Sequence, residues 1–219
     1  MTEQRYDSAI IKAFEQISTA SVSDALQALG THGYLSSEIN LVTGRKIVGP
    51  ASTVREIPTT ESLPPTHALQ AIDAASEGDV IVIDVGAERE VAAWGGLMTA
   101  GAVANKLAGV ILDAGVRDVE EINRDFEGFT VFARSTSPAT TLGRFKTVSS
   151  NEPVVVGGVT IDPGDLIVAD RDGVVAVPRD LVEQTLAGAQ DIEDREREQT
   201  RLILESGSLA TGLAKYNRI

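Results

Sequence analysis

Arg117 and Asp118 are adjacent in the sequence and follow an apolar segment, Gly109–Asp113, that is typical of a buried strand. The guanidinium of Arg117 is always charged, and its planar set of donors suits a carboxylate or an enolate oxygen. Asp118 offers hard oxygen ligands, and Mg²⁺ typically takes one or two carboxylates while it keeps several waters. The pair is therefore a candidate site for a small anionic substrate held against a divalent metal ion. The structural alternative is that Asp118 caps the helix that it begins.

The segment Gly95-Gly96-Leu97-Met98 opens a second predicted helix, directly after Trp94. The first backbone amides of a helix lack intrahelical partners, and the helix dipole favours an anion there. Glycine allows a carboxylate to approach these amides closely. We therefore predict that the Gly95–Met98 amides bind a substrate carboxylate; a tight turn that packs the helix is the structural alternative.

Each of these loops follows a predicted strand, Val80–Val85 for the glycines and Gly109–Asp113 for the Arg-Asp pair. In parallel sheets, ligands bind outside the carboxyl ends of the strands. We therefore expect the two loops to meet in one crevice. Asp84 and Asp113, at the strand ends, are secondary candidates for orienting water or Arg117.

Other chemistries lack the residues that they need. The chain has no cysteine, which excludes disulfides, thiolate nucleophiles and Cys-ligated zinc, and its two histidines, His32 and His67, are far apart. Schiff-base catalysis requires a desolvated lysine in a pocket. None of the lysines ends an apolar strand; they are Lys12, Lys46, Lys106, Lys146 and Lys215. Carbon–carbon chemistry in this chain would therefore need a metal rather than an imine.

The composition limits the partners. A net charge of −13 over 219 residues argues against nucleic acid, which is bound by clustered Lys and Arg. It leaves room for a small anionic substrate or a basic protein partner. The first residues lack the apolar region of a secretory signal, and no run approaches the roughly 20 apolar residues that span a bilayer. We expect a cytoplasmic protein with no membrane segment and a single domain over residues 1–219.

The hydropathy pattern predicts an α/β fold. From residue 80 to 134, apolar β-branched strands alternate with helices, which indicates a mainly parallel sheet covered on both faces. After Pro138, short strands separated by glycine-rich turns suggest an antiparallel or mixed layer. Predicted helices are Asp7–Ile17, capped by Asp7 or Ser8; one capped at Ser21 and stopped by Gly30; Thr66–Ser76; and a long polar helix from Arg179 to about Glu205. Later predicted strands are Phe145–Ser149, Val154–Ile161, Leu166–Asp170 and Val174–Val177.

Several motifs resemble the regulator of ribonuclease activity A-like family, which includes the class II 4-hydroxy-4-methyl-2-oxoglutarate/4-carboxy-4-hydroxy-2-oxoadipate aldolases. The resemblance covers nearly the whole chain, and GVILDAGVRD is its most specific part. The matching segments are VSDAL (22–26), VGPASTV (48–54), GDVIVIDV (78–85), WGGLMTAGAVANKLAGVILDAGVRD (94–118) and VVVGGVTIDPGDLIVADRDGVVAVP (154–178). The resemblance implies a swivelling-type α/β sandwich with a central mixed, partly parallel sheet, N-terminal helices and a long C-terminal helix, assembled as a homotrimer or a dimer of trimers.

The resemblance also implies roles for individual residues. Arg117 would bind the keto or enolate oxygen, Asp118 would hold Mg²⁺ or Mn²⁺ partly through water, and the Gly95–Met98 amides would bind the pyruvyl carboxylate. Active sites in the family lie at subunit interfaces, where an acidic residue from the neighbour's C-terminal helix often contacts metal-bound water. Glu198 is the best match for that residue, and Glu196 is the next.

The leading expectation is a divalent-metal-dependent pyruvate aldolase that acts on 4-hydroxy-2-oxo acids or diacids and also decarboxylates oxaloacetate. Many relatives carry Glu or Asp where this chain has Gly96, which removes a possible acid–base group and puts the aldol substrate in question. The alternative is a non-catalytic regulator that inhibits a ribonuclease by binding a basic protein segment. Regulatory relatives are usually shorter, which favours the aldolase.

Overall fold

The centre of the fold is a curled, mixed sheet of eight strands. In the computed structural model, which describes residues 6–214, seven strands follow the order β1-β7-β5-β3-β2-β12-β13, and β9 pairs with the far end of β2. The strands are β1 (Asn40–Thr43), β2 (Ile47–Pro58), β3 (Val80–Asp84), β5 (Gly109–Leu112), β7 (Thr130–Ala133), β9 (Phe145–Ser150), β12 (Leu166–Asp170) and β13 (Gly173–Val177). Strands β2, β3, β5 and β7 are parallel; the parallel arrangement of β3, β5 and β7 was predicted, whereas that of β2 was not.

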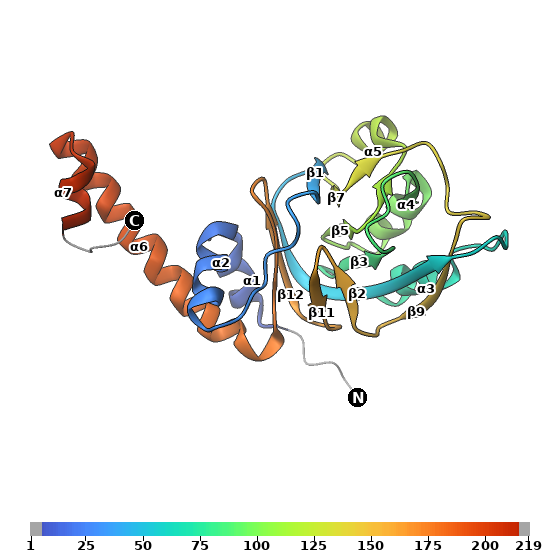
Figure 1. Cartoon of the computed structure of the whole chain (residues 1–219), viewed down its shortest axis with the longest axis horizontal. Coiled ribbons are helices and arrows are strands. Elements are labelled where there is room, and N and C mark those ends of the chain that lie inside the picture. The colour runs from blue at the N-terminus through green and yellow to red at the C-terminus, as the bar shows by residue number, and fades with distance from the viewer. Residues whose placement is uncertain (1–5, 215–219) are drawn as a thin grey trace.

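Strand β2 connects the two halves of this sheet. Its first residues, 47–50, pair antiparallel with β12, residues 51–55 pair parallel with β3, and residues 54–58 pair antiparallel with β9. A strand that changes partners along its length accumulates twist, and Figure 1 shows β2 sweeping across the molecule. The curl folds β12 and β13 over one face of the parallel strands.

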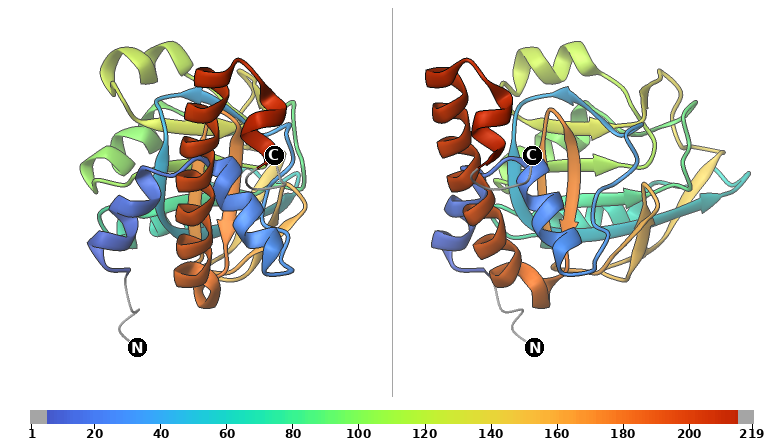
Figure 2. Two further views of the ribbon diagram at one scale, coloured as in Figure 1. Left: turned by 90° about the vertical axis from the view of Figure 1, so that its left-hand side faces the viewer. Right: turned by 60° about the vertical axis from the view of Figure 1, so that its left-hand side comes forward.

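Three apolar clusters hold the layers together. The first joins one face of the parallel strands to α3 (Thr66–Ala74), α4 (Gly96–Ala104) and α5 (Val119–Asp125). The second lies between the opposite face and β12, β13 and a small hairpin. The third packs the outer face of β12 and β13 against α1 (Ser8–Glu15), α2 (Thr19–Ala28) and α6 (Val182–Ser206), as Figures 1 and 2 show. The parallel sheet is therefore covered on both faces, but its second cover consists of strands rather than helices.

The N-terminal helices begin and end largely as their sequence indicates. The Asp7 carboxylate accepts a hydrogen bond from the Ala9 amide at 2.8 Å and caps α1. Gly30 follows the end of α2 with φ +80°, a conformation that favours glycine. The predicted cap at Ser21 is wrong, because Ser18 is the cap and its hydroxyl accepts a bond from the Ser21 amide. The helix therefore begins at Thr19, one turn earlier than predicted.

Two elements differ from the prediction. The segment predicted as one strand, Val154–Ile161, is a hairpin of β10 (Val154–Val156) and β11 (Val159–Ile161), because Gly157 and Gly158 both adopt positive φ. A three-stranded parallel sheet of β4 (Ala92–Trp94), β6 (Gly115–Val116) and β8 (Ser135–Thr136) was not predicted. Its strands of two or three residues are too short to produce a hydropathy pattern.

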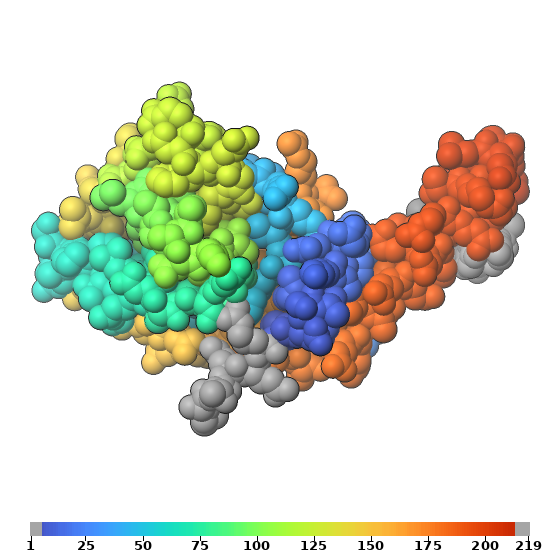
Figure 3. All heavy atoms as spheres, turned by 180° about the vertical axis from the view of Figure 1, so that it is seen from behind, coloured from blue at the N-terminus to red at the C-terminus, as the bar shows by residue number. Residues whose placement is uncertain are grey.

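The C-terminal region is helical, as predicted. A short 3₁₀ turn, Arg179–Leu181, leads into α6, and α7 (Leu209–Ala214) packs against the end of α6. Figure 3 shows this region extending away from the sheet. The predicted α/β class, with a mixed sheet, N-terminal helices and a long C-terminal helix, is confirmed. Within residues 6–214, no helix combines the length and apolar character needed to cross a bilayer.

Candidate active site

The small parallel sheet positions the two predicted loops side by side. Strands β4 and β6 are neighbours, with Trp94 opposite Val116, and the Arg117 amide donates a hydrogen bond to the Trp94 carbonyl at 3.0 Å. Gly95 and Asp118 therefore leave adjacent strands in the same direction. The prediction that the two loops meet is confirmed, although β4 and β6 carry them rather than β3 and β5 directly.

The Asp118 carboxylate connects the two loops. Asp118 adopts a left-handed conformation with φ +59° and starts α5 without capping it by its side chain. Its Oδ2 atom instead accepts a hydrogen bond from the Gly96 amide at 3.0 Å and lies 3.5 Å from Nε of Arg117. The structural alternative, in which Asp118 caps its own helix, is therefore wrong, because the carboxylate caps α4.

The two glycines at the start of α4 allow two carboxylates to approach. A Cβ atom on Gly95 would lie 2.6 Å from Oδ2 of Asp118, and a Cβ atom on Gly96 would lie 2.7 Å from Oε1 of Glu121. Both distances are too short for a side chain to be added without displacing a carboxylate. Sequence reasoning missed Glu121, and the signal that could have found it is the i,i+3 spacing from Asp118, which places both residues on one helix face.

The backbone amides in the first turn of α4 come before the first intrahelical hydrogen bond. The first intrahelical bond of α4 runs from the Thr99 amide to the Gly95 carbonyl at 3.0 Å. The Gly96 amide binds Asp118, so the amides of Leu97 and Met98 are those that the helix dipole offers to an anion. Buried Trp94 fixes this turn, because its indole N–H donates to the Thr99 hydroxyl at 2.8 Å.

These groups line one cleft of about 290 Å³. The start of α4, the Arg117–Asp118 pair and the segment 140–142 form its walls. The lining residues are Pro64, Pro65, Leu69, Ala92, Ala93, Trp94, Gly95, Gly96, Leu97, Met98, Arg117, Asp118, Thr140, Thr141 and Leu142. All the residues that were predicted to bind substrate therefore lie in this one cleft: Gly95, Gly96, Leu97, Met98 and Arg117.

The two secondary candidates have other partners. Asp113 forms an ion pair of 2.5 Å with Nε of Arg134, and both side chains are about 5% exposed. The Asp84 carboxylate accepts a hydrogen bond from the Gly86 amide and lies 3.8 Å from Nε of Arg55. The Asp113 carboxylate therefore binds Arg134 rather than Arg117, and the Asp84 carboxylate stabilises the turn after β3. A role of either carboxylate in orienting water stays a prediction.

Glu198 and Glu196 lie on α6, across the molecule from the cleft. Figure 1 places α6 beyond α1 and α2, on the opposite side of the sheet from α4 and α5. Within one copy of the chain, these residues do not contribute to the cleft. The expectation that Glu198 reaches the site from a neighbouring subunit stays a prediction.

Lys46 is a partly buried lysine that does not line the cleft. Burial lowers its pKa, and its ammonium donates to the Ile17 carbonyl. Nearby Asp170, Glu193 and Glu15 oppose that lowering. Lys46 therefore ties the end of α1 to the sheet, and Lys215 lies outside the described residues.

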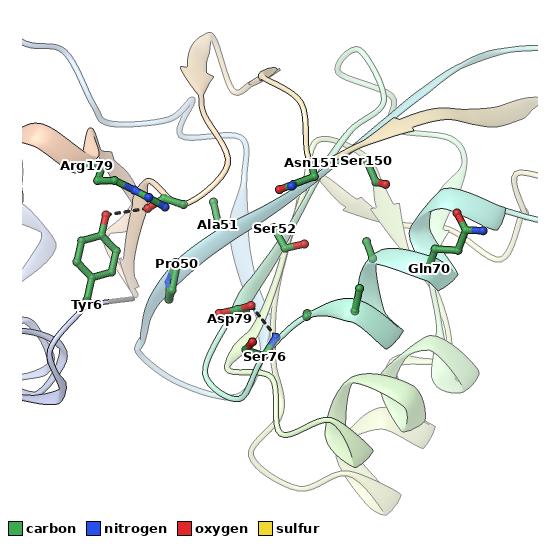
Figure 4. Close-up of a pocket in the computed structure, with 14 residues that line it drawn as sticks. Tyr6, Pro50, Ala51, Ser52, Gln70, Ser76, Asp79, Ser150, Asn151 and Arg179 are labelled. Atoms are coloured by element: carbon green, nitrogen blue, oxygen red, sulfur yellow. Dashed lines mark hydrogen bonds between the residues drawn. The ribbon is translucent and has the colours of Figure 1, made fainter. Parts of the chain in front are cut away.

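A second, larger cleft of about 450 Å³ lies at the amino end of β3, next to Pro50, Ser52 and Arg179 (Figure 4). The Tyr6 hydroxyl donates to the Gly164 carbonyl at 2.7 Å, and burial raises the pKa of Tyr6 to about 12. Asp79 accepts a hydrogen bond from the Ser76 amide at 2.8 Å. No sequence motif indicated this cleft, and none of the predicted site residues lines it.

Several known proteins are similar to this chain in sequence or in fold. DlpA from Legionella pneumophila is 34% identical over 191 residues, which cover 87% of this chain but only 31% of that protein. A protein of Halalkalibacterium halodurans named "Putative 4-hydroxy-4-methyl-2-oxoglutarate aldolase" is 36% identical, over 85% of this chain and 87% of that protein. The crystal structure of Streptomyces coelicolor RraAS2, described as an unusual member of the RNase ES inhibitor RraA protein family, aligns with a TM-score of 0.81 and 26% identity, over 88% of this chain and 97% of that one.

A family model agrees with these similarities. The model of the RraA-like family, described as aldolase/RraA, matches residues 19–176, a range that includes both loops of the cleft. Several relatives carry aldolase names, which points to a lyase. The chain belongs to the aldolase/RraA family.

Proposed function

We propose that this protein is a divalent-metal-dependent pyruvate aldolase that cleaves 4-hydroxy-2-oxo acids. The observation that carries the proposal is the cleft that gathers the Arg117 guanidinium, the Asp118 carboxylate and the start of α4. The aldolase names of relatives support the same reaction class. The stretch of DlpA that this chain matches is 31% of that protein's length.

Asp118 is the residue that would hold Mg²⁺ or Mn²⁺. Its side chain is 35% exposed, and among the described residues only its Oδ2 atom is engaged. Residues 6–214 contain no group of three or more His, Asp or Glu side chains placed to hold a metal. A single carboxylate fits a hard cation that keeps most of its waters. When bound, such a cation supplies Lewis-acid polarisation of the substrate oxygen.

The chain's own groups would orient the substrate from two sides. The amides of Leu97 and Met98 would bind the C1 carboxylate at the positive end of α4. The Arg117 guanidinium would lie against the C2 oxygen. As the C3–C4 bond breaks, its electron pair moves toward C2 and the negative charge on this oxygen grows, so Arg117 stabilises the transition state more than the substrate.

The rest of the reaction follows from that enolate. Solvent water accepts the 4-hydroxyl proton, C4 becomes the carbonyl carbon of the second product, and a proton returned from water to C3 gives pyruvate. Oxaloacetate loses CO₂ to form the same enolate, so we propose that the same residues support its decarboxylation. A neighbouring subunit in a homotrimer or a dimer of trimers would complete the site with Glu198.

A ribonuclease regulator is the second candidate function. Two observations favour it: RraAS2 is described as a member of an RNase inhibitor family, and the net charge of −13 suits a basic protein segment. This function would not require the Arg117–Asp118 pair or a metal. Metal dependence of pyruvate release therefore distinguishes the two proposals.

The test is a pyruvate-release assay on oxaloacetate and on 4-hydroxy-2-oxo acids, with Mg²⁺, with Mn²⁺ and with a chelator. The aldolase proposal expects turnover that the chelator abolishes and that added metal restores. An absence of metal-dependent turnover on all substrates would contradict the aldolase proposal and favour the regulator.

A further inference from the structure

A buried ion pair lies where the main sheet passes into the small sheet of β4, β6 and β8. Asp113 is between β5 and β6, and Arg134 is between β7 and β8. The Oδ1 atom of Asp113 lies 2.5 Å from Nε of Arg134, and each side chain is 5% exposed. The proposed reaction gives neither residue a role, so this pair of buried charges needs another explanation.

The two paths of the chain differ in length at this point. In the main sheet, Ile111 of β5 is opposite Phe132 of β7, and in the small sheet Gly115 of β6 is opposite Ser135 of β8. The path from β5 to β6 is therefore longer by one residue. An extra residue in one of two paired strands bends that strand and changes the direction of the residues that follow. The direction of β6 thus depends on contacts other than strand pairing.

Asp113 also holds the loop that leads into β4. Its Oδ2 atom accepts a hydrogen bond from the Ala87 amide at 3.0 Å, and its carbonyl oxygen accepts one from the Glu88 amide at 3.1 Å. Ala87 has φ +64°, a conformation that costs free energy for a residue with a side chain and persists only where the surroundings enforce it. One residue therefore fixes both the end of β5 and the approach to β4.

Arg134 extends these contacts to another part of the chain. Its Nη1 atom donates to the Glu38 carboxylate, whose other oxygen accepts a hydrogen bond from Nη1 of Arg89 at 2.7 Å. Arg89 lies in the loop between β3 and β4. A planar guanidinium can hold two carboxylates in fixed directions, which a lysine ammonium does less well. The charge network, as we call it, consists of Asp113, Arg134, Glu38 and Arg89.

The charge network comes directly before the strands that carry the candidate active site. Strand β4 leads into Gly95 and Gly96, and β6 leads into Arg117 and Asp118. The hydrogen bond from the Gly96 amide to the Asp118 carboxylate depends on how these two strands are placed. None of the four network residues lines the cleft, so they can act on it only through the strands. A misplacement of about 1 Å at a catalytic group can cost about 10²-fold in rate.

We infer that Arg134 is a positioning residue for the candidate active site and acts, with Asp113, by fixing the placement of β4 and β6. Its effect on turnover rests on the proposed function, whereas the placement can be measured without a substrate. Trp94 is the only tryptophan of the chain, is 1% exposed and ends β4. Its fluorescence therefore reports on the strand that carries the start of α4.

The experiment uses Arg134→Lys, which keeps the positive charge but not the geometry that holds both carboxylates. We expect acrylamide quenching of the Trp94 fluorescence to increase and kcat/KM for pyruvate release with Mg²⁺ to fall by about 10-fold or more. Asp170→Asn is the matched control. Asp170 accepts two hydrogen bonds from Thr19 at the start of α2, on the other side of the sheet from α4, so its loss should lower stability and leave both measurements unchanged.

A second variant, Asp113→Asn/Arg134→Met, removes both charges, so neither is left buried without its partner. It should show the same two changes as Arg134→Lys. Wild-type quenching and kcat/KM in either variant, when circular dichroism shows it to be folded, would overturn the inference. So would equal changes in Asp170→Asn, or failure of both Arg134 variants to fold, because the ion pair would then serve stability alone. Increased quenching in a protein whose wild type releases no pyruvate would support the placement and contradict the proposed function.

Discussion

The Asp118 carboxylate accepts a hydrogen bond from the Gly96 amide at 3.0 Å, so the residue proposed to hold a cation also caps the neighbouring helix α4. This contact joins the two loops of the cleft across adjacent strands. The amide of Gly96 is therefore satisfied by the protein, while those of Leu97 and Met98 remain ahead of the first intrahelical bond. One carboxylate thus combines a structural role with the proposed chemical one, and suitable substitutions can separate the two.

Asp118→Asn keeps an oxygen that can accept the Gly96 hydrogen bond but removes the charge. We expect pyruvate release to fall by about 10²-fold or more, since loss of one charged group at a site of developing charge has effects of this size. Stability should stay close to that of the wild type. Asp118→Ala should lose the same activity and also about 1 kcal/mol of unfolding free energy, because the cap on α4 is lost.

Titration with Mn²⁺, followed by electron paramagnetic resonance, and urea unfolding measure these two roles. Glu120→Ala is the control, since Glu120 is an exposed neighbour on α5. Normal Mn²⁺ binding by Asp118→Asn would contradict the assignment of Asp118 to the metal.

Arg117→Lys keeps the positive charge but loses the planar set of donors. We expect kcat to fall by about 10²-fold or more with a smaller change in KM, because the guanidinium acts on charge that develops only in the transition state. Steady-state kinetics with oxaloacetate measure both constants. Arg124→Lys on α5 is the matched control, because Arg124 pairs with Asp125 on an exposed surface. A kcat within twofold of the wild type for Arg117→Lys would exclude the proposed role.

Gly95→Ala tests the close approach of the two loops. A Cβ atom would lie 2.6 Å from Oδ2 of Asp118 and 3.1 Å from Cγ of Arg117, so both side chains must shift. We expect at least about a 10-fold loss of kcat/KM from this misplacement. Gly101→Ala, further along α4, meets only Ile72 at 3.3 Å and is the control. Unchanged activity of Gly95→Ala would show that the observed placement of Arg117 and Asp118 is not needed.

The alternation of buried strands and helices predicted the parallel half of the sheet, because β3 and β5 have an apolar cluster on each face. Strand β2 could not be predicted in the same way. Its residues 47–50 and 54–58 pair with strands more than 80 positions later in the chain, and such distant pairing leaves no local pattern. The curl of the sheet was missed for this reason. The antiparallel layer of β12 and β13 was predicted, but its position over one face of the parallel strands was not.

The candidate site was predictable because its groups occupy the ends of elements. Glycines at a helix start and an Arg-Asp pair after a strand are visible in sequence, whereas the geometry that joins them is not. The Asp118–Gly96 bond depends on the short strands β4 and β6, and the contact between Glu121 and Gly96 depends on how α5 packs beside α4. Asp113 was misassigned because Arg134, its partner, lies on a different loop.

Glu56 provides a test that is independent of the cleft. It is 4% exposed, neither of its carboxylate oxygens has a hydrogen-bond partner among the described residues, and burial raises its pKa to about 7. An unfolded glutamate ionises near pH 4.5. Between these two values the unfolded state therefore binds fewer protons than the folded state, so the unfolding free energy falls as pH rises.

The fall should begin above the unfolded pKa and level off above about pH 7, for a total of about 3 kcal/mol at 1.36 kcal/mol per unit. Glu56→Gln cannot ionise, so its unfolding free energy should lack this fall, and it should exceed that of the wild type by more at pH 8 than at pH 5. Urea unfolding at pH 5, 6, 7 and 8 measures the difference, with Glu127→Gln as an exposed control. Parallel pH profiles for the wild type and Glu56→Gln would show that Glu56 is ionised in the folded protein throughout this range.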